Sequence, residues 1–164
     1  MADIALFSRE PPDRVWVRML VPPAEVHERM TMTDNLSAAT RSKVMASIRS
    51  QNTKPEIIVR RLLWSSGKRY RVHDRSVPGS PDISNKRKQV AVFIDGCFWH
   101  GCVKCYREPR TNVPYWRNKI VQNGKRRRDV LRELGRNKWV VFQFWEHEIK
   151  EKAPAIALSI GKKL

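Results

Sequence analysis

The sequence predicts an α/β fold, with a mixed central sheet flanked by helices. Segments with helical spacing alternate with short runs of β-branched and aromatic residues, in the order helix, three strands, helix, strand. This order is typical of a sheet with helices packed on it. At 164 residues the chain is long enough for one ordinary domain and too short for two. We therefore expect one domain over residues 36–164, preceded by an arm.

The expected arm, residues 1–35, differs in composition from the rest of the chain. It holds four of the ten prolines and has six acidic against four basic residues, although the whole chain carries a net charge of +17. Its Pro-Pro pairs interrupt any regular period. We expect the arm to be disordered, so the positive charge belongs to the domain.

Two helices are expected to open the domain. Residues 44–48 have the apolar spacing of a short basic helix. Thr53 and Glu56 have the spacing of a capping box, so a second helix begins there, and Gly67 ends it. The side chains expected to be buried on the second helix are Ile58, Val59, Leu62 and Leu63.

The remaining elements follow from local patterns and turn residues. The run 89–95 is β-branched and aromatic, which predicts a central, well-buried strand. The other expected elements are strands over 70–73, from Asp82 and over 139–145, a long helix over about 112–135, and a final helix with Ile156 and Ile160 on its apolar side.

The excess of positive charge is typical of a protein with a polyanionic partner. Lys and Arg total 33 against 16 Asp and Glu, and nucleic acid is the first candidate because it releases counterions to a basic surface. An anionic membrane surface is the second candidate. No apolar run approaches the ~18 residues that span a bilayer, and no signal-peptide core is present. We expect a cytoplasmic, nucleoid-associated protein without a membrane partner.

The three cysteines lie within nine residues, at Cys97, Cys102 and Cys105. An odd number of cysteines in a reducing compartment suits disulfides poorly, whereas three thiolates at this spacing are typical of a structural zinc site. A fourth ligand must come from elsewhere in the chain. His147 would lie nearby if the strands over 89–95 and 139–145 are neighbours. Three unrelated buried thiols are the alternative.

Two aspartates resemble the metal-binding hairpin of the PD-(D/E)xK nucleases. Asp82 follows a proline in a turn, and Asp95 ends the expected central strand, so a hairpin could bring both to one Mg²⁺. The lysine of that pattern is missing, and His100 is the candidate base in its place. The alternatives are a turn cap for Asp82 and a zinc ligand or a surface histidine for His100.

Basic residues are densest between Lys104 and Lys138, and aromatic residues are interleaved with them. A basic run is usually a solvated helix face. Loop aromatics beside it, however, are suited to stacking on bases or to wedging into a duplex. The aromatic residues concerned are Phe98, Trp99, Tyr106, Tyr115 and Trp116.

Six motifs occur in order between about residues 39 and 149. They are Thr40-Arg41-Ser42-Lys43-x-Met45, Asn52-Thr53-x-x-Glu56, Pro78-Gly79-x-Pro81-Asp82, Phe93-Ile94-Asp95-Gly96-Cys97-Phe98-Trp99-His100, Tyr115-Trp116-x-x-Lys119-Ile120-x-x-Asn123 and Trp145-Glu146-His147. The series resembles the very short patch repair (Vsr) DNA mismatch endonucleases. Residues 1–35 lie outside the resemblance.

The resemblance implies a restriction-endonuclease-like fold of the PD-(D/E)xK type with a structural zinc site. It also implies an Mg²⁺-dependent nickase that cuts one strand of double-stranded DNA beside the thymine of a T:G mismatch, the product of 5-methylcytosine deamination. Such an enzyme is expected to act as a monomer, with mismatch-repair proteins as further partners.

The resemblance assigns roles to individual positions. Asp82 and the main-chain carbonyl of Ile94 are the implied Mg²⁺ ligands, and His100 is the implied general base. Glu56 and Asp95 match supporting catalytic positions. The positions at or beside the zinc ligands are Cys97, Cys102, Cys105 and His147. The implied DNA-binding residues are Met45, Phe98, Trp99, Trp116, Lys119 and Arg126.

One position departs from the family pattern. The family tends to have, after the helix asparagine, an aspartate that orients the catalytic histidine, and Arg127 stands there in this chain. Either Asp129 takes over that role from a shifted turn, or His100 works without this partner and activity is lower or lost.

Three functions are therefore open on the sequence alone. The first is the mismatch nickase. The second is a restriction-like or mobile-element nuclease on the same fold that reads a different sequence. The third is a zinc-stabilised DNA-binding protein with weakened catalysis. Nicking of a T:G duplex against a matched duplex separates the first two, and binding without cleavage favours the third.

Overall fold

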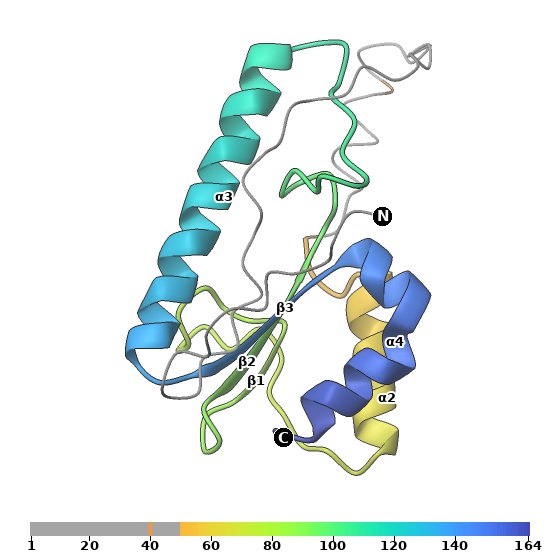
Figure 1. Ribbon diagram of the computed structural model, residues 1–164, viewed down its shortest axis with the longest axis vertical. Helices are drawn as coiled ribbons and strands as arrows, with labels where there is room; N and C mark the ends of the chain where they lie inside the picture. Colours follow the sequence, from red (N-terminus) through yellow and green to blue (C-terminus); the bar gives the residue numbers. More distant parts are fainter. Residues whose placement is uncertain (1–39, 41–49) are drawn as a thin grey trace, which may run out of the picture.

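The computed structural model describes residue 40 and residues 50–164 (Figure 1). The elements in the described part are α2 (Lys54–Ser65), β1 (Ile83–Asn85), β2 (Val90–Asp95), α3 (Val113–Arg136), β3 (Val140–Trp145) and α4 (Glu146–Gly161). The expected arm over residues 1–35 and the expected helix over 44–48, with Met45, lie outside the described residues. None of the described helices combines the length and the apolar composition of a membrane span.

The three strands form one mixed sheet in the order β1-β2-β3. β1 and β2 are antiparallel, with Ile83 opposite Val92, whereas β2 and β3 are parallel, with Asp95 opposite Trp145. The parallel strands end at the same edge of the sheet, and the chain leaves both of them there. The expected mixed sheet with flanking helices is confirmed, although it has three strands among the described residues and not four.

Helices cover both faces of this sheet, with α2 and α4 on one face and α3 on the other (Figure 1). Every second residue of β2 enters the core beneath α2 and α4, namely Val90, Val92 and Ile94. The intervening Ala91 and Phe93 pack in the core beneath α3. Burial on both faces explains why β2 is apolar along almost its whole length. Asp95 continues the alternation and lies on the α3 face.

Helix α2 begins and ends where the sequence predicts. Thr53 is its N-cap residue, but the Thr53 hydroxyl donates to Glu56 Oε1 (2.7 Å) and accepts nothing from the helix backbone. The other oxygen of Glu56 accepts the Asn52 backbone N–H (3.0 Å). The reciprocal capping box is therefore not formed, and Glu56 instead stabilises the turn before the helix. Gly67, with a φ of +73°, follows the helix as expected.

Two local expectations are wrong. Residues 70–73 form no strand and contribute only one bridge, between Arg71 and Ser84. His73 has a φ of 46°, a left-handed conformation that strands do not use, so the extended segment cannot continue. Ile58 was expected in the core but is 41% exposed, because α2 packs mainly through Val59 and Leu63.

Gly79 allows the loop before β1 to pack closely against α3. Its φ is +75°, and a Cβ atom built there would lie 2.5 Å from Val130 Cγ1. Gly67 has a similar φ of +73°, but a Cβ atom there would meet nothing within 4 Å. Substitution at Gly67 therefore tests backbone strain alone, whereas substitution at Gly79 tests backbone strain together with a steric clash.

We predict that Gly79→Ala lowers the free energy of unfolding more than Gly67→Ala does. Gly67→Ala should cost about 1–2 kcal/mol through left-handed strain alone. Gly79→Ala adds the clash with Val130, and Val130→Ala in that background should recover part of the loss. Urea denaturation of the wild type and these three variants measures this, and equal losses for both glycines would contradict the close packing.

Candidate active site

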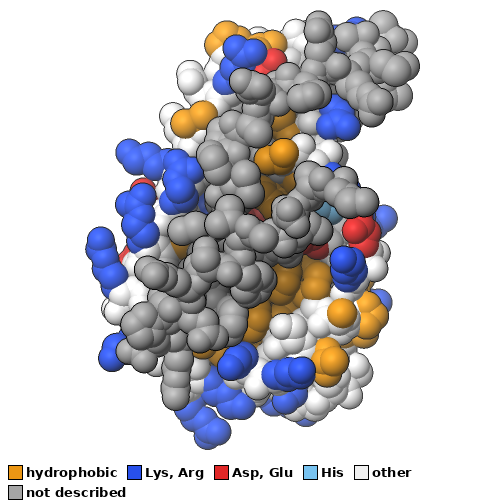
Figure 2. Space-filling model, in the orientation of Figure 1, with side chains coloured by type: hydrophobic (Ala, Val, Ile, Leu, Met, Phe, Trp, Pro, Cys, Tyr) orange, Lys and Arg blue, Asp and Glu red, His pale blue; other side chains and the backbone are white. Residues whose placement is uncertain are grey.

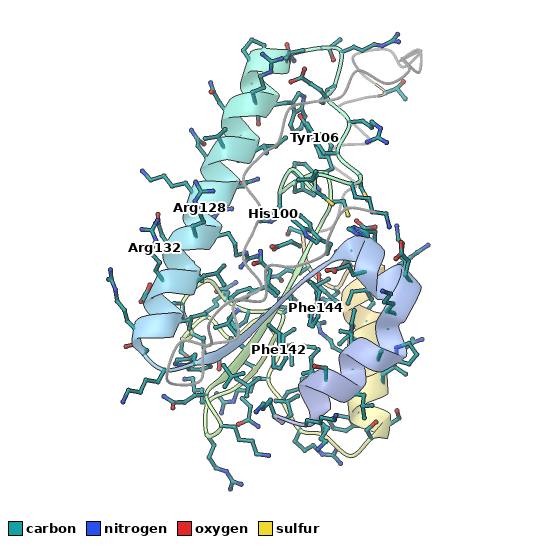
Figure 3. All side chains as sticks on the ribbon, in the orientation of Figure 1. His100, Tyr106, Arg128, Arg132, Phe142 and Phe144 are labelled. Atoms are coloured by element: carbon teal, nitrogen blue, oxygen red, sulfur yellow. The ribbon has the colours of Figure 1, made fainter. Side chains whose placement is uncertain are left out.

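The edge at which β2 and β3 end carries most of the residues that the sequence singled out. Antiparallel pairing of β1 with β2 brings Asp82, just before β1, to the end of β2, where its Oδ2 atom accepts the Ile94 N–H (2.7 Å). His100 follows in the loop after β2, and Figure 3 shows it beyond the sheet edge, between α3 and α4. This edge is the candidate active site.

Helix α2 adds a charged cluster on the other side of Asp82. The Glu56 side chain is 3% exposed and pairs with Arg60 Nη2 (2.7 Å). The same Nη2 atom lies 2.9 Å from His73 Nε2 and 3.2 Å from the Asp82 main-chain oxygen. Ligand atoms of Glu56, His73 and Asp82 lie within 4.8 Å of one another, so these three residues could hold a metal ion.

The surroundings of Asp82 fit a hard divalent cation. Its side chain is 16% exposed. Burial raises the pKa of Asp82 to about 7, and repulsion from Glu56 adds to the increase, although the hydrogen bond from Ile94 opposes it. A cation beside this carboxylate would stabilise its charged form. Carboxylate and carbonyl oxygens are the ligands that Mg²⁺ prefers.

His100 has the features of a neutral base. Its backbone N–H donates to the Gly96 carbonyl (3.2 Å), which folds the loop back onto the strand end. Its Nε2 atom lies 3.5 Å from Asp95 Oδ1. Burial lowers the pKa of His100, and Arg127 lowers it further, while Asp95 opposes both. The imidazole is therefore neutral near pH 7 and able to accept a proton.

Asp95 is the carboxylate beside His100, and it is almost completely buried. Its side chain is 1% exposed. Arg127 Nη2 of α3 donates to Oδ1 and Gln143 Nε2 of β3 donates to Oδ2, both at 2.5 Å. The Arg127 guanidinium also lies 4.1 Å from the centroid of the Phe93 ring. Asp95 is thus held from two elements while one of its oxygens faces the histidine.

The structure shows which carboxylate lies beside His100, given that Arg127 stands where an aspartate is expected. Asp129 does not take over the position of the expected aspartate, because it is half-exposed and pairs with Arg132 (3.2 Å). His100 nevertheless has a carboxylate within reach, namely Asp95. Arg127, at the α3 position where the resemblance leads us to expect an aspartate, is neutralised by that same Asp95.

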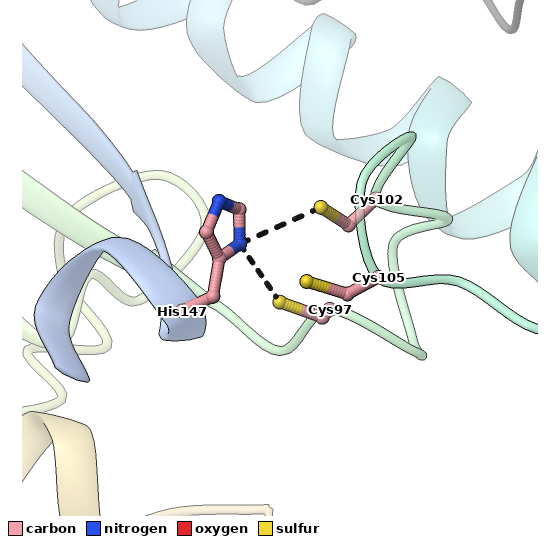
Figure 4. Close-up of side chains that lie close together, drawn as sticks. All are labelled: Cys97, Cys102, Cys105 and His147. Carbon is pink, nitrogen blue, oxygen red and sulfur yellow. Dashed lines mark hydrogen bonds between the residues drawn. The ribbon is translucent and has the colours of Figure 1, made fainter. Parts of the chain in front are cut away.

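The three cysteines and His147 form a second candidate metal centre (Figure 4). The strands β2 and β3 are neighbours, as this site requires, and His147 lies in the first turn of α4. The Cys97 and Cys102 sulfurs lie 3.3 and 3.6 Å from His147 Nδ1. With Cys105, the four ligand atoms all lie within 4.8 Å of one another.

These distances suit a tetrahedral metal ion. With metal–sulfur and metal–nitrogen bonds of about 2.3 and 2.0 Å and tetrahedral angles, sulfur and nitrogen would lie about 3.5 Å apart. Burial raises the pKa of Cys97 to about 12 and also raises the pKa of Cys105. Without a cation these thiols are therefore neutral, and a bound metal ion would stabilise the thiolate form.

Aromatic rings from the loop and from α3 pack into one cluster. Phe98 meets Trp99 at 5.3 Å and Trp116 at 5.1 Å between ring centroids, and Trp99 meets Trp116 at 5.8 Å. Asn123 Nδ2 donates to the Trp99 carbonyl (2.9 Å), which ties the loop to α3. The three rings are only half-buried, so a partner can reach them.

Helix α3 also supplies a basic surface. Figure 2 shows Lys and Arg side chains spread along this helix. The exposed members on its second half are Lys125, Arg126, Arg128, Arg132 and Arg136. Of the implied DNA-binding residues on α3, Lys119 is half-buried and Arg126 is exposed.

Three residues of the site were not predicted from the sequence. Arg60 and His73 belong to no motif, and their contacts depend on how α2 docks. Gln143 offered a usable signal, because it is the one polar residue in the apolar strand β3. A polar residue there predicts a buried hydrogen-bond partner.

Comparison with known proteins gives a consistent result. The family model described as "DNA mismatch endonuclease Vsr" matches residues 33–107. "Type II nicking enzyme V.HpaIIP" of Haemophilus parainfluenzae is 39% identical over 135 residues, covering 80% of this chain and 95% of that protein. "DNA mismatch endonuclease Vsr" of Escherichia coli (strain K12) is 40% identical over 120 residues, covering 70% and 74%.

A third relative, "Type II nicking enzyme V.NmeAIP" of Neisseria meningitidis serogroup A, is 41% identical over 124 residues, covering 74% of this chain and 88% of that protein. The similarity to all three relatives thus extends well beyond the segment that the family model matches.

We predict that Arg127→Ala destabilises the protein by roughly 3 kcal/mol or more, because it leaves the Asp95 carboxylate buried without its cation. Arg127→Asp should cost at least as much, since it places a second carboxylate beside the first. Arg128→Ala removes an exposed neighbour and should change stability by less than about 0.5 kcal/mol. Chemical denaturation compares the three variants. An Arg127→Ala variant as stable as Arg128→Ala would show that the pair contributes little.

Proposed function

Because the chain belongs to the Vsr family of DNA mismatch endonucleases, we propose that it nicks one strand of duplex DNA beside the thymine of a T:G mismatch. Such mismatches arise when 5-methylcytosine is deaminated, so the proposed role is repair. The observation that carries the proposal is the His100–Asp95 pair at the same sheet edge as the buried Asp82. A hydrolytic nuclease needs a base and a metal ligand side by side.

The proposed fold type is that of the restriction endonucleases. Antiparallel β1 and β2 bring Asp82 to the end of β2, in the manner of the PD-(D/E)xK hairpin. In this proposal Asp82 and the Ile94 main-chain carbonyl hold Mg²⁺, and Glu56 supports the site. The bound ion would supply positive charge to stabilise the charge that develops on the phosphate.

His100 is the proposed general base. With the hydrogen on Nε2 directed at Asp95 Oδ1, the Nδ1 atom is left to accept a proton from the attacking water. Asp95 orients the ring and stabilises the imidazolium that forms. Arg127 and Gln143 hold the Asp95 carboxylate in place for this role.

Selectivity for a mismatch is assigned to the aromatic cluster of Phe98, Trp99 and Trp116. A T:G pair is already weakly stacked, so inserting rings there costs less than at a matched pair. The basic surface of α3 would attract the DNA backbone whatever its sequence. Lys119 and Arg126 on α3, and Met45 outside the described residues, are proposed to contact the DNA.

The proposed metal of the Cys97, Cys102, Cys105 and His147 centre is Zn²⁺ in a structural role. Thiolates with one imidazole are a common structural zinc set. The ion would join the loop that carries the aromatic residues and His100 to the start of α4. It would thereby hold the loop against the sheet edge.

We predict Mg²⁺-dependent nicking of a T:G duplex and far slower nicking of the matched duplex. Asp82→Ala should abolish nicking while mismatch binding persists, because the carboxylate holds the metal and not the DNA. His100→Ala should slow the reaction by about 100-fold or more, the usual scale for loss of a general base. Single-turnover cleavage of labelled duplexes measures the rates.

Asp129→Ala is the matched control for these variants, because it removes an exposed carboxylate that pairs only with Arg132 among the described contacts. It should nick at the normal rate. Equal cutting of matched and mismatched duplexes would favour the restriction-like alternative, and full activity of His100→Ala would refute the assigned base.

We predict one zinc ion per chain in protein purified under reducing conditions. Cys105→Ser should lose the metal and lower the melting temperature, because the ion then lacks a ligand. Val103→Ser changes an exposed side chain between two of the cysteines and should keep the metal. Elemental analysis with thermal denaturation provides the measurement. A zinc-free, reduced protein with unchanged stability in Cys105→Ser would rule out the site.

A further inference from the structure

His73 lies against the Asp82 carboxylate, and neither the motifs nor the proposed mechanism gives it a role. Its side chain is only 14% exposed. Its Nδ1 atom lies 3.8 Å from Asp82 Oδ1, and its Nε2 atom is directed at the Arg60 guanidinium, 2.9 Å away. The imidazole thus stands between α2 and the residue at the start of β1.

Arg60 determines which nitrogen of His73 carries the hydrogen. His73 Nε2 faces two groups, the Arg60 guanidinium at 2.9 Å and Glu56 Oε2 at 3.3 Å. Because a guanidinium can only donate and is the closer of the two, we assign Nε2 as the acceptor and place the hydrogen of the neutral ring on Nδ1. A hydrogen on Nε2 would point at an Arg60 N–H. Arg60 is itself fixed by Glu56 Oε2 (2.7 Å) and by Asn52 Oδ1 (2.6 Å).

The backbone of His73 is held in an unfavourable conformation. Its φ of 46° lies in the left-handed region, which is uncommon for residues other than glycine, although asparagine, aspartate and histidine adopt it more often than the rest. Such strain persists where the surrounding structure imposes it, and it is concentrated at functional sites. The strain and the Arg60 hydrogen bond both keep the Nδ1–H of His73 directed toward Asp82.

We propose that His73 is a positioning residue for Asp82. The Ile94 N–H fixes one carboxylate oxygen at 2.7 Å, and the His73 Nδ1–H faces the other at 3.8 Å, beyond hydrogen-bond distance but close enough to attract it electrostatically. Both oxygens of Asp82 therefore have a preferred direction before a metal ion arrives. The neutral ring does this without adding a positive charge that would repel the ion. This inference rests on the proposed role of Asp82 as a metal ligand.

Metal affinity provides a test that does not depend on nicking. Mn²⁺ binding to the full chain, followed by electron paramagnetic resonance, should weaken by about tenfold or more in His73→Ala, the usual effect of losing a residue that orients a ligand. His73→Asn should bind nearly as well as the wild type, because the asparagine amide offers a donor near the Nδ1 position. Asparagine also tolerates the left-handed backbone.

Two further variants complete the series. His73→Gln places its donor near the Nε2 position instead, so it should bind Mn²⁺ as weakly as His73→Ala. Val72→Ala changes an exposed neighbour and should bind normally. Because His73→Asn keeps the donor and suits the backbone, it shows the effect of the donor even if His73→Ala is unstable.

The tautomer itself is accessible to nitrogen-15 NMR of the metal-free protein, which should find the hydrogen on Nδ1 of His73. A hydrogen on Nε2, or unchanged Mn²⁺ affinity in His73→Ala alongside a large loss in Asp82→Asn, would overturn the inference and leave the metal site intact. If the wild type binds no Mn²⁺, the proposed metal site fails, and the positioning role of His73 fails with it.

Discussion

The parallel pairing of β2 with β3 is the interaction on which the site depends. Because Asp95 lies opposite Trp145, the loop after β2 and the first turn of α4 begin side by side. That placement brings Cys97 to His147 and lets Gln143 reach Asp95. A shift of register by one residue would turn Asp95 into the opposite core, where α3 could not neutralise it.

The second constraint is the cost of burying charge at the sheet edge. Asp95 is nearly inaccessible to solvent and is satisfied by Arg127 and Gln143, while Glu56 is satisfied by Arg60 and the turn before α2. Asp95 therefore ties α3 to the sheet edge. Glu56 is held within α2 and the turn before it, and its partner Arg60 links α2 to the Asp82 main-chain oxygen. Asp82 differs, because its burial raises its pKa and no side-chain cation among its described hydrogen-bond partners offsets the charge. That imbalance supports the proposed role of Asp82 as a metal ligand.

Local patterns were sufficient for most of the fold. The apolar run of β2, the Gly67 helix end and the amphipathic α3 each depend on residues close together in the chain, and all three appear where expected. The strand expected over 70–73 failed because the left-handed His73 has no signature in composition. Ile58 failed because periodicity identifies an apolar side of a helix without showing how much of it a neighbour covers.

The sequence by itself determined the residue types: three closely spaced cysteines, a Pro-Asp turn, a histidine after a buried strand, and a basic helix with aromatic neighbours. Spacing along the chain was enough because each of these features is local. Only the tertiary structure decided which partners they meet. Asp95 and Arg127 are 32 residues apart in the sequence, and Cys97 and His147 are 50 apart. Residues so far apart in the chain come into contact only when the sheet and helices pack together. The substitution at Arg127 looked like the loss of a partner for His100, but packing supplies Asp95 instead.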